Sequence, residues 1–331
     1  MATSSILFRL TAKAARSDKA GIPGLGRSLL LLLALAVLGP ILPDYELLGL
    51  NQHLLLALNV LALNFCLGLG GQASLAQGAF CGLGAYLSVL AHQAWPDATP
   101  VILAGVALAT WALGFGLSYP LEKLGEGFLA MATLGLSLIF TNLAVSLASI
   151  TGGPDGMLVS TPLSFFGQAS LRGDLSHYYL FLTLLGLGLY LFLALRHSRL
   201  GRALLACKSD PMAAAACGIR RPAARSLAFG LGAALSALAG AAYAPYGGFI
   251  SPSEFDLELS LKTLLYLVIG GAGNPVRPIL AVLGLEALLG HAHFLGEART
   301  LFHGLLLGAA LLAPEAWKRL RARRAKAEAA T

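Results

Sequence analysis

The feature that most constrains the fold of this 331-residue chain is a series of long apolar runs without charges. The first, SLLLLLALAVLGPIL, occupies residues 28–42, and similar runs recur along the chain. A bilayer span needs roughly 20 mostly apolar residues in a helix, because hydrocarbon offers no partner for free backbone groups. The composition agrees, with 57% hydrophobic residues, 12% charged residues and a mean hydropathy of +0.75. We therefore expect an all-α polytopic membrane protein.

The lengths and patterns of the apolar runs predict about ten transmembrane helices, and a count of eight or nine stays open. The expected spans are 28–42, 48–68, 73–92, 99–120, 127–150, 177–195, 226–246, 258–272, 277–291 and 299–314. The span 258–272 is short and leads into GGAGNPVRP, where glycine, asparagine and proline interrupt a helix. Irregular backbone inside a membrane survives only when protein or a cavity surrounds it. We therefore expect broken or re-entrant segments.

Basic residues orient the chain. Of the 23 Lys and Arg residues, 18 lie before residue 28, between Arg196 and Arg225, or after Trp317. The positive-inside rule places these segments, and both termini, in the cytoplasm. This gives a basic leader (1–27), a transmembrane domain (28–314) with a cytoplasmic loop (197–225), and a basic tail (315–331). The first apolar run lacks a cleavage signature, so we interpret it as a membrane helix. Because membrane orientation explains the net charge of +7, no nucleic-acid partner is implied.

The segment GLGGQASLAQGAFCGLGAY, residues 68–86, interrupts two apolar runs with small and polar residues. Gly78 and Gly82 form a small-xxx-small pair, which lets another helix approach closely. Gln72, Ser74 and Gln77 carry polar groups that lipid could not satisfy, so they should face protein or water. Two interpretations stay open: the segment lines a passage, or its glycines pack helices and its glutamines bridge them.

Other groups with chemical potential are few. Glu286 is the clearest ionisable residue within a span and is a functional candidate for that reason. One acid makes a poor proton relay, and Glu286, His291 and His293 form the only nearby set that a membrane enzyme could use. The four cysteines show no metal-site spacing, so we expect no metal, disulfide or cofactor. No Gly-Lys dipeptide occurs, which excludes a phosphate-binding loop and leaves ATP hydrolysis to other subunits.

Two polar stretches suggest contact surfaces. In RHSRLGRALLACKSDPMAAAACGIRRPAARS (196–226), Asp210 suits a helix N-cap, Pro211 the first helical position and Gly218 the C-terminal stop. With a second short helix near 201–207, this predicts an ordered surface for another protein. The stretch 150–174 should face outward and contains the turn signal GGPDG. It is either a docking surface or a simple connection.

Four segments, 68–86, 132–156, 198–219 and 239–274, resemble the LivM-type membrane permeases of ATP-binding-cassette importers for branched-chain amino acids, to which urea and amide permeases are related. The resemblance implies a multi-pass subunit of the bacterial inner membrane. Its partners would be a second, LivH-like permease, two cytoplasmic ATPase subunits and a periplasmic substrate-binding protein. The chain itself would be no enzyme.

The resemblance and the sequence together suggest an ATPase-coupling set and a substrate-path set. The first contains Gly201, Arg202, Asp210, Pro211, Ala215 and Gly218, and the second contains Gln72, Ser74, Gln77, Gly78, Gly82 and Glu286.

The substrate class stays open between two readings. A path with small and apolar groups and few charges suits branched-chain or other aliphatic amino acids, and it suits urea or short amides about as well. A self-sufficient channel or secondary transporter is the third reading. Dependence of uptake on ATPase subunits separates it from the importer.

Overall fold

The computed structural model describes residues 23–122, 126–159 and 173–291 together with residue 306. Within these residues the regular secondary structure is helical except for one short antiparallel pairing, in which β1 (Met157–Leu158) pairs with β2 (Phe249–Ile250). The all-α fold class is confirmed. The leader before residue 23, the basic tail and nearly all of the expected span 299–314 lie outside the described residues.

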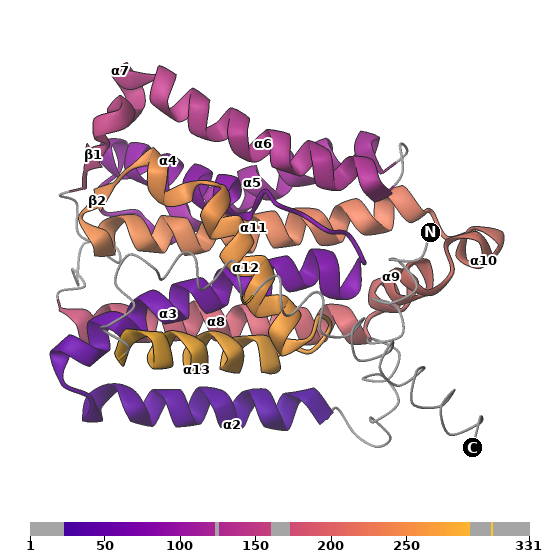
Figure 1. Ribbon diagram of the computed structural model, residues 1–331, viewed down its shortest axis with the longest axis horizontal. Helices are drawn as coiled ribbons and strands as arrows, with labels where there is room; N and C mark the ends of the chain where they lie inside the picture. Colours follow the sequence, from indigo (N-terminus) through magenta and orange to yellow (C-terminus); the bar gives the residue numbers. More distant parts are fainter. Residues whose placement is uncertain (1–22, 123–125, 160–172, 292–305, 307–331) are drawn as a thin grey trace, which may run out of the picture.

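The long helices lie side by side along the longest axis of the molecule (Figure 1). Five helical segments are long and apolar enough to cross a bilayer: Asp44–Leu69, Thr99–Leu121, Phe128–Ser146, Asp174–His197 and Arg221–Gly247. They correspond to α3 (Asp44–Leu63) with its continuation η2 (Asn64–Leu69), α5 (Thr99–Leu121), α6 (Glu126–Ser146), α8 (Asp174–His197) and α11 (Arg221–Gly247). A shorter apolar helix covers Leu25–Ile41, formed by α2 (Pro23–Leu38) and the 3-10 turn η1 (Gly39–Ile41). The chain is therefore a polytopic membrane protein.

Helix α3 ends in the irregular way that its sequence suggests. It continues as the π-helical turn η2, and no regular structure follows until α4 (Gln77–Ala94) begins. We call residues 70–76 the first break. Gly71 has a φ of +71° there, a conformation that side chains with a Cβ rarely adopt. The expected span 73–92 therefore starts four residues too early, because the glycines delay the helix.

A second interruption separates two short helices, α12 (Leu257–Gly270) and α13 (Arg277–His291). With 14 and 15 residues they are each about 21–23 Å long, less than the roughly 30 Å of a hydrocarbon core. We call residues 271–276 the second break. It falls within the GGAGNPVRP stretch that predicts a helix interruption.

Helix α11 is the central element of the fold. It contacts α3, α4, α5, α8 and α9, and in Figure 1 it runs through the middle of the molecule. Small residues permit this: a Cβ on Gly84 of α4 would collide with the Ala237 carbonyl of α11, and one on Gly240 would collide with the Cys81 carbonyl of α4. The two backbones thus approach each other through absent side chains.

The two ends of the bundle differ in structure. The helices α9 (Arg199–Ser209) and α10 (Pro211–Ala216) extend from one end. The β1–β2 pair lies at the other end with α7 (Ala148–Thr151) and the 3-10 turns η3 (Gly153–Asp155) and η4 (Pro252–Phe255). The segment between α8 and α11 comprises residues 198–220 and lies within the predicted cytoplasmic loop 197–225, because α11 begins at Arg221.

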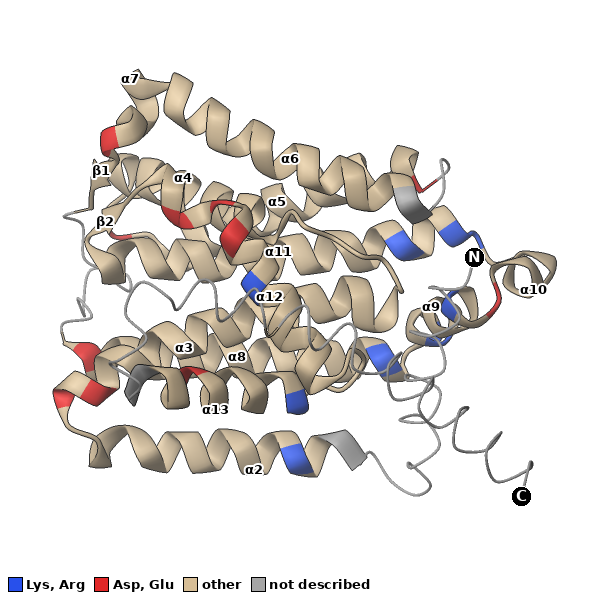
Figure 2. Ribbon diagram, viewed as in Figure 1, with Lys and Arg blue, Asp and Glu red and all other residues tan. Residues whose placement is uncertain are grey.

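The charges follow the same division. Figure 2 shows Lys and Arg gathered toward the end that carries α9 and α10, with most Asp and Glu toward the opposite end. Exceptions include Asp210 before α10, Glu122 after α5, and Lys262 in α12. This polarity agrees with the orientation that the positive-inside rule predicts.

Glycine-mediated packing generates a prediction. The substitution Gly240→Leu should prevent α4 and α11 from approaching and should lower the free energy of unfolding by about 3 kcal/mol or more, through overpacking. Gly116→Leu on α5 is the matched control, since nothing lies within 4 Å of a Cβ at that position. Thermal unfolding of the detergent-solubilised protein measures both. Equal melting temperatures for the two variants would contradict the packing role.

Candidate functional site

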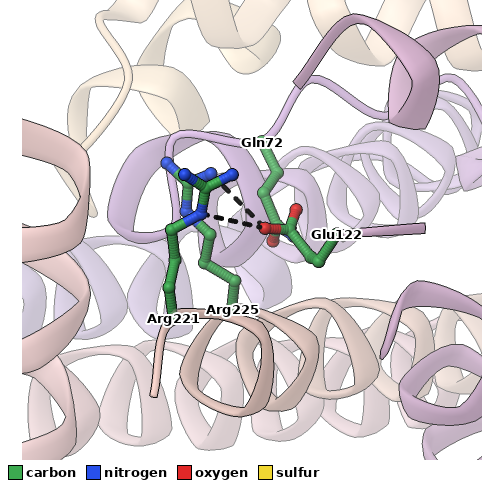
Figure 3. Close-up of polar contacts among 4 residues, drawn as sticks. All are labelled: Gln72, Glu122, Arg221 and Arg225. Atoms are coloured by element: carbon green, nitrogen blue, oxygen red, sulfur yellow. Dashed lines mark hydrogen bonds and ion pairs between the residues drawn. The ribbon is translucent and has the colours of Figure 1, made fainter. Parts of the chain in front are cut away.

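The first break is tied to a buried ion cluster, which we define as Gln72, Glu122, Arg221 and Arg225 (Figure 3). The Gln72 side-chain amide donates to the Glu122 carboxylate over 2.6 Å. Arg225 forms an ion pair with the same carboxylate at 3.4 Å, and Arg221 lies 3.8 Å from it. The Glu122 and Arg225 side chains are only 2% and 1% exposed. Such a pair persists away from water because each charge compensates the other.

The second break is held against η2, the turn that leads into the first break, through Asn64 in the first position of η2. Its side-chain amide donates to the Asn274 carbonyl (2.8 Å), and its oxygen accepts from the Gly273 backbone N–H (2.8 Å). Arg196, near the end of α8, donates to the Gly273 carbonyl (2.8 Å). The side chains of η2 and α8 thereby satisfy the irregular backbone of the second break, as buried backbone groups require.

A cavity of about 950 Å³ opens beside α3. Its lining extends along α3 from Tyr45 to Asn59, 14 positions or about 21 Å of helix. The other lining residues come from the α2–α3 connection, α3 itself, α4, α11, η4, α12 and α13: Leu38, Leu42, Glu46, Leu48, Gly49, Leu50, Gln52, His53, Leu55, Leu56, Cys81, Ala239, Tyr243, Glu254, Phe255, Leu259, Lys262, Glu286 and Ala287. The volume lies in the range of small-molecule sites, and the lining is mainly apolar with a few polar groups, as such sites commonly are.

Charged and polar groups line this cavity at different depths. Glu286 of α13 is buried and accepts a hydrogen bond from the Tyr266 hydroxyl over 2.6 Å. Lys262 of α12 is partly exposed and pairs with Glu258 at 2.7 Å. Toward the β1–β2 end, burial raises the pKa of the Glu254 carboxyl, while the Tyr243 hydroxyl donates to it and opposes the shift. The cavity thus offers carboxylates and one ammonium to a ligand within an apolar surround.

The predicted substrate-path residues do not all lie at the cavity. Glu286 lines the cavity, whereas Gln72, Ser74, Gln77, Gly78 and Gly82 are absent from its lining. Gln72 belongs to the ion cluster, and the Ser74 hydroxyl accepts from the Ala76 N–H (3.3 Å) in the turn before α4. The Gln77 carbonyl accepts from Ser236 of α11 (2.8 Å), although its side-chain oxygen has no hydrogen-bond partner among the described residues. Their role in a substrate path stays a prediction.

The two glycines of this set make packing contacts. The Gly78 N–H donates to the Ser260 hydroxyl (2.9 Å), and a Cβ there would meet the Phe255 and Asp256 carbonyls. A Cβ on Gly82 would collide with the Phe140 ring. Both glycines therefore let α4 pack against η4, the start of α12 and the Phe140 side chain of α6. This is the contact that the packing interpretation of the segment predicts.

The predicted coupling residues occupy α9, α10 and their boundaries. The Asp210 carboxylate accepts from the Met212 and Ala213 N–H groups at 2.9 and 3.0 Å, Pro211 starts α10, and Gly218 has a φ of +77°. The caps inferred from the sequence are therefore confirmed. Ala215 is exposed, and Arg202 donates to the His197 carbonyl (3.1 Å). Gly201 abuts the Leu195 carbonyl, so it permits the tight turn from α8 into α9.

Sequence reasoning missed several residues of these sites. Asn59 and Asn64 are amides within the apolar run LLLALNVLALNF, a signal of the same kind as the glutamines that were identified. Glu122 follows an apolar span directly, which marks it only as a candidate for the membrane boundary. Its pairing with Arg225, 103 positions away, has no local sequence signal.

Comparison with known proteins gives a consistent family. The profile of the family described as "Branched-chain amino acid transport system / permease component" matches residues 47–313. The LivM permease protein of a high-affinity branched-chain amino acid transport system from Escherichia coli K12 is 30% identical over 245 residues. Its counterpart in Salmonella typhimurium is 31% identical over 243 residues.

These alignments cover 67% of the chain but only 58% and 57% of the two LivM proteins, so the chain spans less than two thirds of their length. The LivH permease protein of a high-affinity branched-chain amino acid transport system in Salmonella typhimurium is 23% identical over 267 residues, covering 74% of the chain and 84% of that protein. No solved structure matches the chain.

The ion cluster generates a prediction about stability. Glu122→Ala removes the carboxylate that Arg225 contacts in a buried position, and we expect a loss of about 3–5 kcal/mol of unfolding free energy. The matched control is Glu258→Ala, which breaks the pair with Lys262. The Glu258 and Lys262 side chains of this pair are 43% and 31% exposed. The loss of unfolding free energy in Glu258→Ala should stay below about 1 kcal/mol. Thermal unfolding in detergent with added lipid compares the two, and similar losses would refute the claim that burial makes the cluster important.

Proposed function

Since the chain belongs to the family of branched-chain amino acid transport permeases, we propose that it is a membrane subunit of an ATP-driven importer. The proposed substrates are branched-chain or other aliphatic amino acids. The family match over residues 47–313 carries this proposal, because it includes most of the cavity lining, both breaks and the α9–α10 pair.

The energy source is inferred to be separate ATPase subunits. The sequence contains no Gly-Lys dipeptide and so no phosphate-binding loop, which supports ATP hydrolysis on another chain. The α9–α10 pair extends from one end of the bundle and offers exposed small and flexible residues, with Met212 82% exposed and Ala215 also exposed. A short helix held by an N-cap at Asp210 is a rigid docking element for an ATPase groove.

The other partners are proposed from the relatives. LivM and LivH are named as permease proteins of the same kind of transport system. By analogy, the chain would pair with a second, LivH-like permease and receive substrate from a periplasmic binding protein. The same analogy places it in a bacterial inner membrane, with the leader (1–27), the tail (315–331) and the α9–α10 pair in the cytoplasm. The distribution of charge along the bundle supports that orientation.

The substrate is proposed from the chemistry of the cavity. An aliphatic amino acid carries one ammonium, one carboxylate and an apolar side chain. Glu286 could face the ammonium and Lys262 the carboxylate, while leucines such as Leu55, Leu56 and Leu259 accommodate the side chain. The names of the relatives also support branched-chain amino acids over urea.

An uptake assay tests the proposal. The chain is reconstituted into liposomes with its partner permease, ATPase subunits and binding protein, and labelled leucine and labelled urea are supplied with ATP inside. We expect leucine uptake that requires both ATP and the ATPase subunits, and no urea uptake. Glu286→Gln should slow leucine uptake while the complex still assembles, because the cavity loses the carboxyl that we propose faces the substrate ammonium.

Either of two results would oppose this function. Leucine uptake without ATPase subunits would indicate a channel or secondary transporter, and uptake of urea in place of leucine would keep the mechanism but change the substrate class.

Orientation is tested separately by cysteine labelling from outside intact cells. Cys217, at the end of α10, is the exposed native cysteine, whereas Cys66, Cys81 and Cys207 are buried. A membrane-impermeant maleimide should leave Cys217 unlabelled and should label Asp155→Cys in a Cys217→Ser background, because η3 lies at the opposite end of the bundle. Labelling of Cys217 from outside would invert the proposed topology.

A further inference from the structure

The ammonium of Lys208 occupies an unusual position. Lys208 is the penultimate residue of α9, yet its Nζ donates to the Gly68 carbonyl (2.7 Å) and the Leu67 carbonyl (3.2 Å), which belong to η2. The contact joins positions about 140 residues apart in the chain. It connects the docking helices directly to the end of the interrupted helix α3.

The carbonyls in this contact are ones that a helix end leaves without backbone partners. The backbone N–H of Gly70 donates to the Phe65 carbonyl (3.3 Å), and that of Gln72 donates to the Cys66 carbonyl (3.0 Å). Lys208 then takes the next two carbonyls, so a cation lies at the negative end of the helix dipole. Its aliphatic stem packs over Gly71, where a Cβ would lie 3.0 Å from the Lys208 Cγ.

The same point is where η2, which leads into the first break, meets the second break. A Cβ on Gly68 would lie 2.8 Å from the backbone nitrogen of Gly273, and Gly273 is also held by Asn64 and Arg196. A displacement of α9 would therefore act on both interruptions in the membrane region. In the part of the chain that the structure describes, the exposed Arg277 of the same end makes no comparable side-chain contact with helix-end carbonyls.

We propose that Lys208 is a positioning residue that transmits movement of the α9–α10 docking helices to the point where η2, which leads into the first break, meets the second break. This inference rests on the proposed ATP-driven importer function. In it, the docking helices follow the ATPase subunits, and the charge-assisted hydrogen bonds of Lys208 make the end of α3 follow α9. Without these bonds, ATP hydrolysis would continue but would move the breaks less effectively.

The protonation state of Lys208 offers an independent probe. Burial lowers its pKa to about 8, with the neighbouring cations Arg225 of α11 and Arg196 of α8 acting in the same direction. Glu122, which follows α5, forms an ion pair with this Arg225. Above about pH 8 the folded chain holds a neutral amine, while an unfolded chain still carries the charge to higher pH. Because the unfolded state binds more protons there, this group makes the fold more stable as pH rises, while the contact loses its charge.

The test uses the complete reconstituted complex and measures leucine taken up per ATP hydrolysed. Lys208→Met keeps the stem but removes the ammonium, and it should lower this ratio about tenfold, as loss of a charge-assisted hydrogen bond would, with ATP hydrolysis still present. Lys208→Arg should restore most of the ratio. The matched control is Arg277→Met, which removes an exposed cation at the start of α13 and should leave the ratio unchanged.

A pH series tests the inference even if the complex that contains Lys208→Met fails to assemble. The ratio of the unmodified complex should fall between about pH 7 and pH 9, across the Lys208 pKa of about 8, whereas the ratio of Lys208→Arg should stay level. An unchanged ratio in Lys208→Met, or identical pH profiles for lysine and arginine, would overturn the inference. If the unmodified complex shows no ATP-dependent uptake, the proposed function fails instead, so the two failures are distinguishable.

Discussion

The structure depends on one constraint: backbone polar groups that a membrane helix leaves unpaired must find partners inside the protein. The chain interrupts its helices at residues 70–76 and 271–276, and it supplies partners for both interruptions from distant side chains. Asn64 and Arg196 hold the second break, and Lys208 holds the carbonyls that precede the first. Each of these side chains is polar or charged in a chain that has few such residues, which explains why they gather here.

Close packing around α11 makes this arrangement possible. Gly84 and Gly240 bring α4 and α11 together, and Gly78 seats α4 against the start of α12. The glycines thus have a structural role in positioning the breaks, while the cavity lies between α3 and the helices α12 and α13.

Charges in the described residues serve two distinct purposes. The ion cluster of Gln72, Glu122, Arg221 and Arg225 joins the first break to α5 and α11, and its Glu122–Arg225 pair is nearly inaccessible. Glu286 and Lys262 instead line the cavity, where a zwitterionic ligand would find opposite charges. The separation places the proposed substrate contacts apart from the contacts that join the first break to α5 and α11.

Local sequence alone determined the class of protein, most helix positions and the caps of α10, because apolar length, charge position and capping residues act within a few positions of one another. The expected spans from 28–42 to 277–291 coincide with helices, and Asp210 and Gly218 act as predicted. Only the tertiary structure decided the roles of the polar residues. Gln72, a predicted path-lining residue, has its partner Glu122 50 positions away, and Lys208 has its carbonyl partners about 140 positions away. Pairings at such separations depend on how the helices pack, and a residue's local sequence carries no record of which distant group will satisfy it.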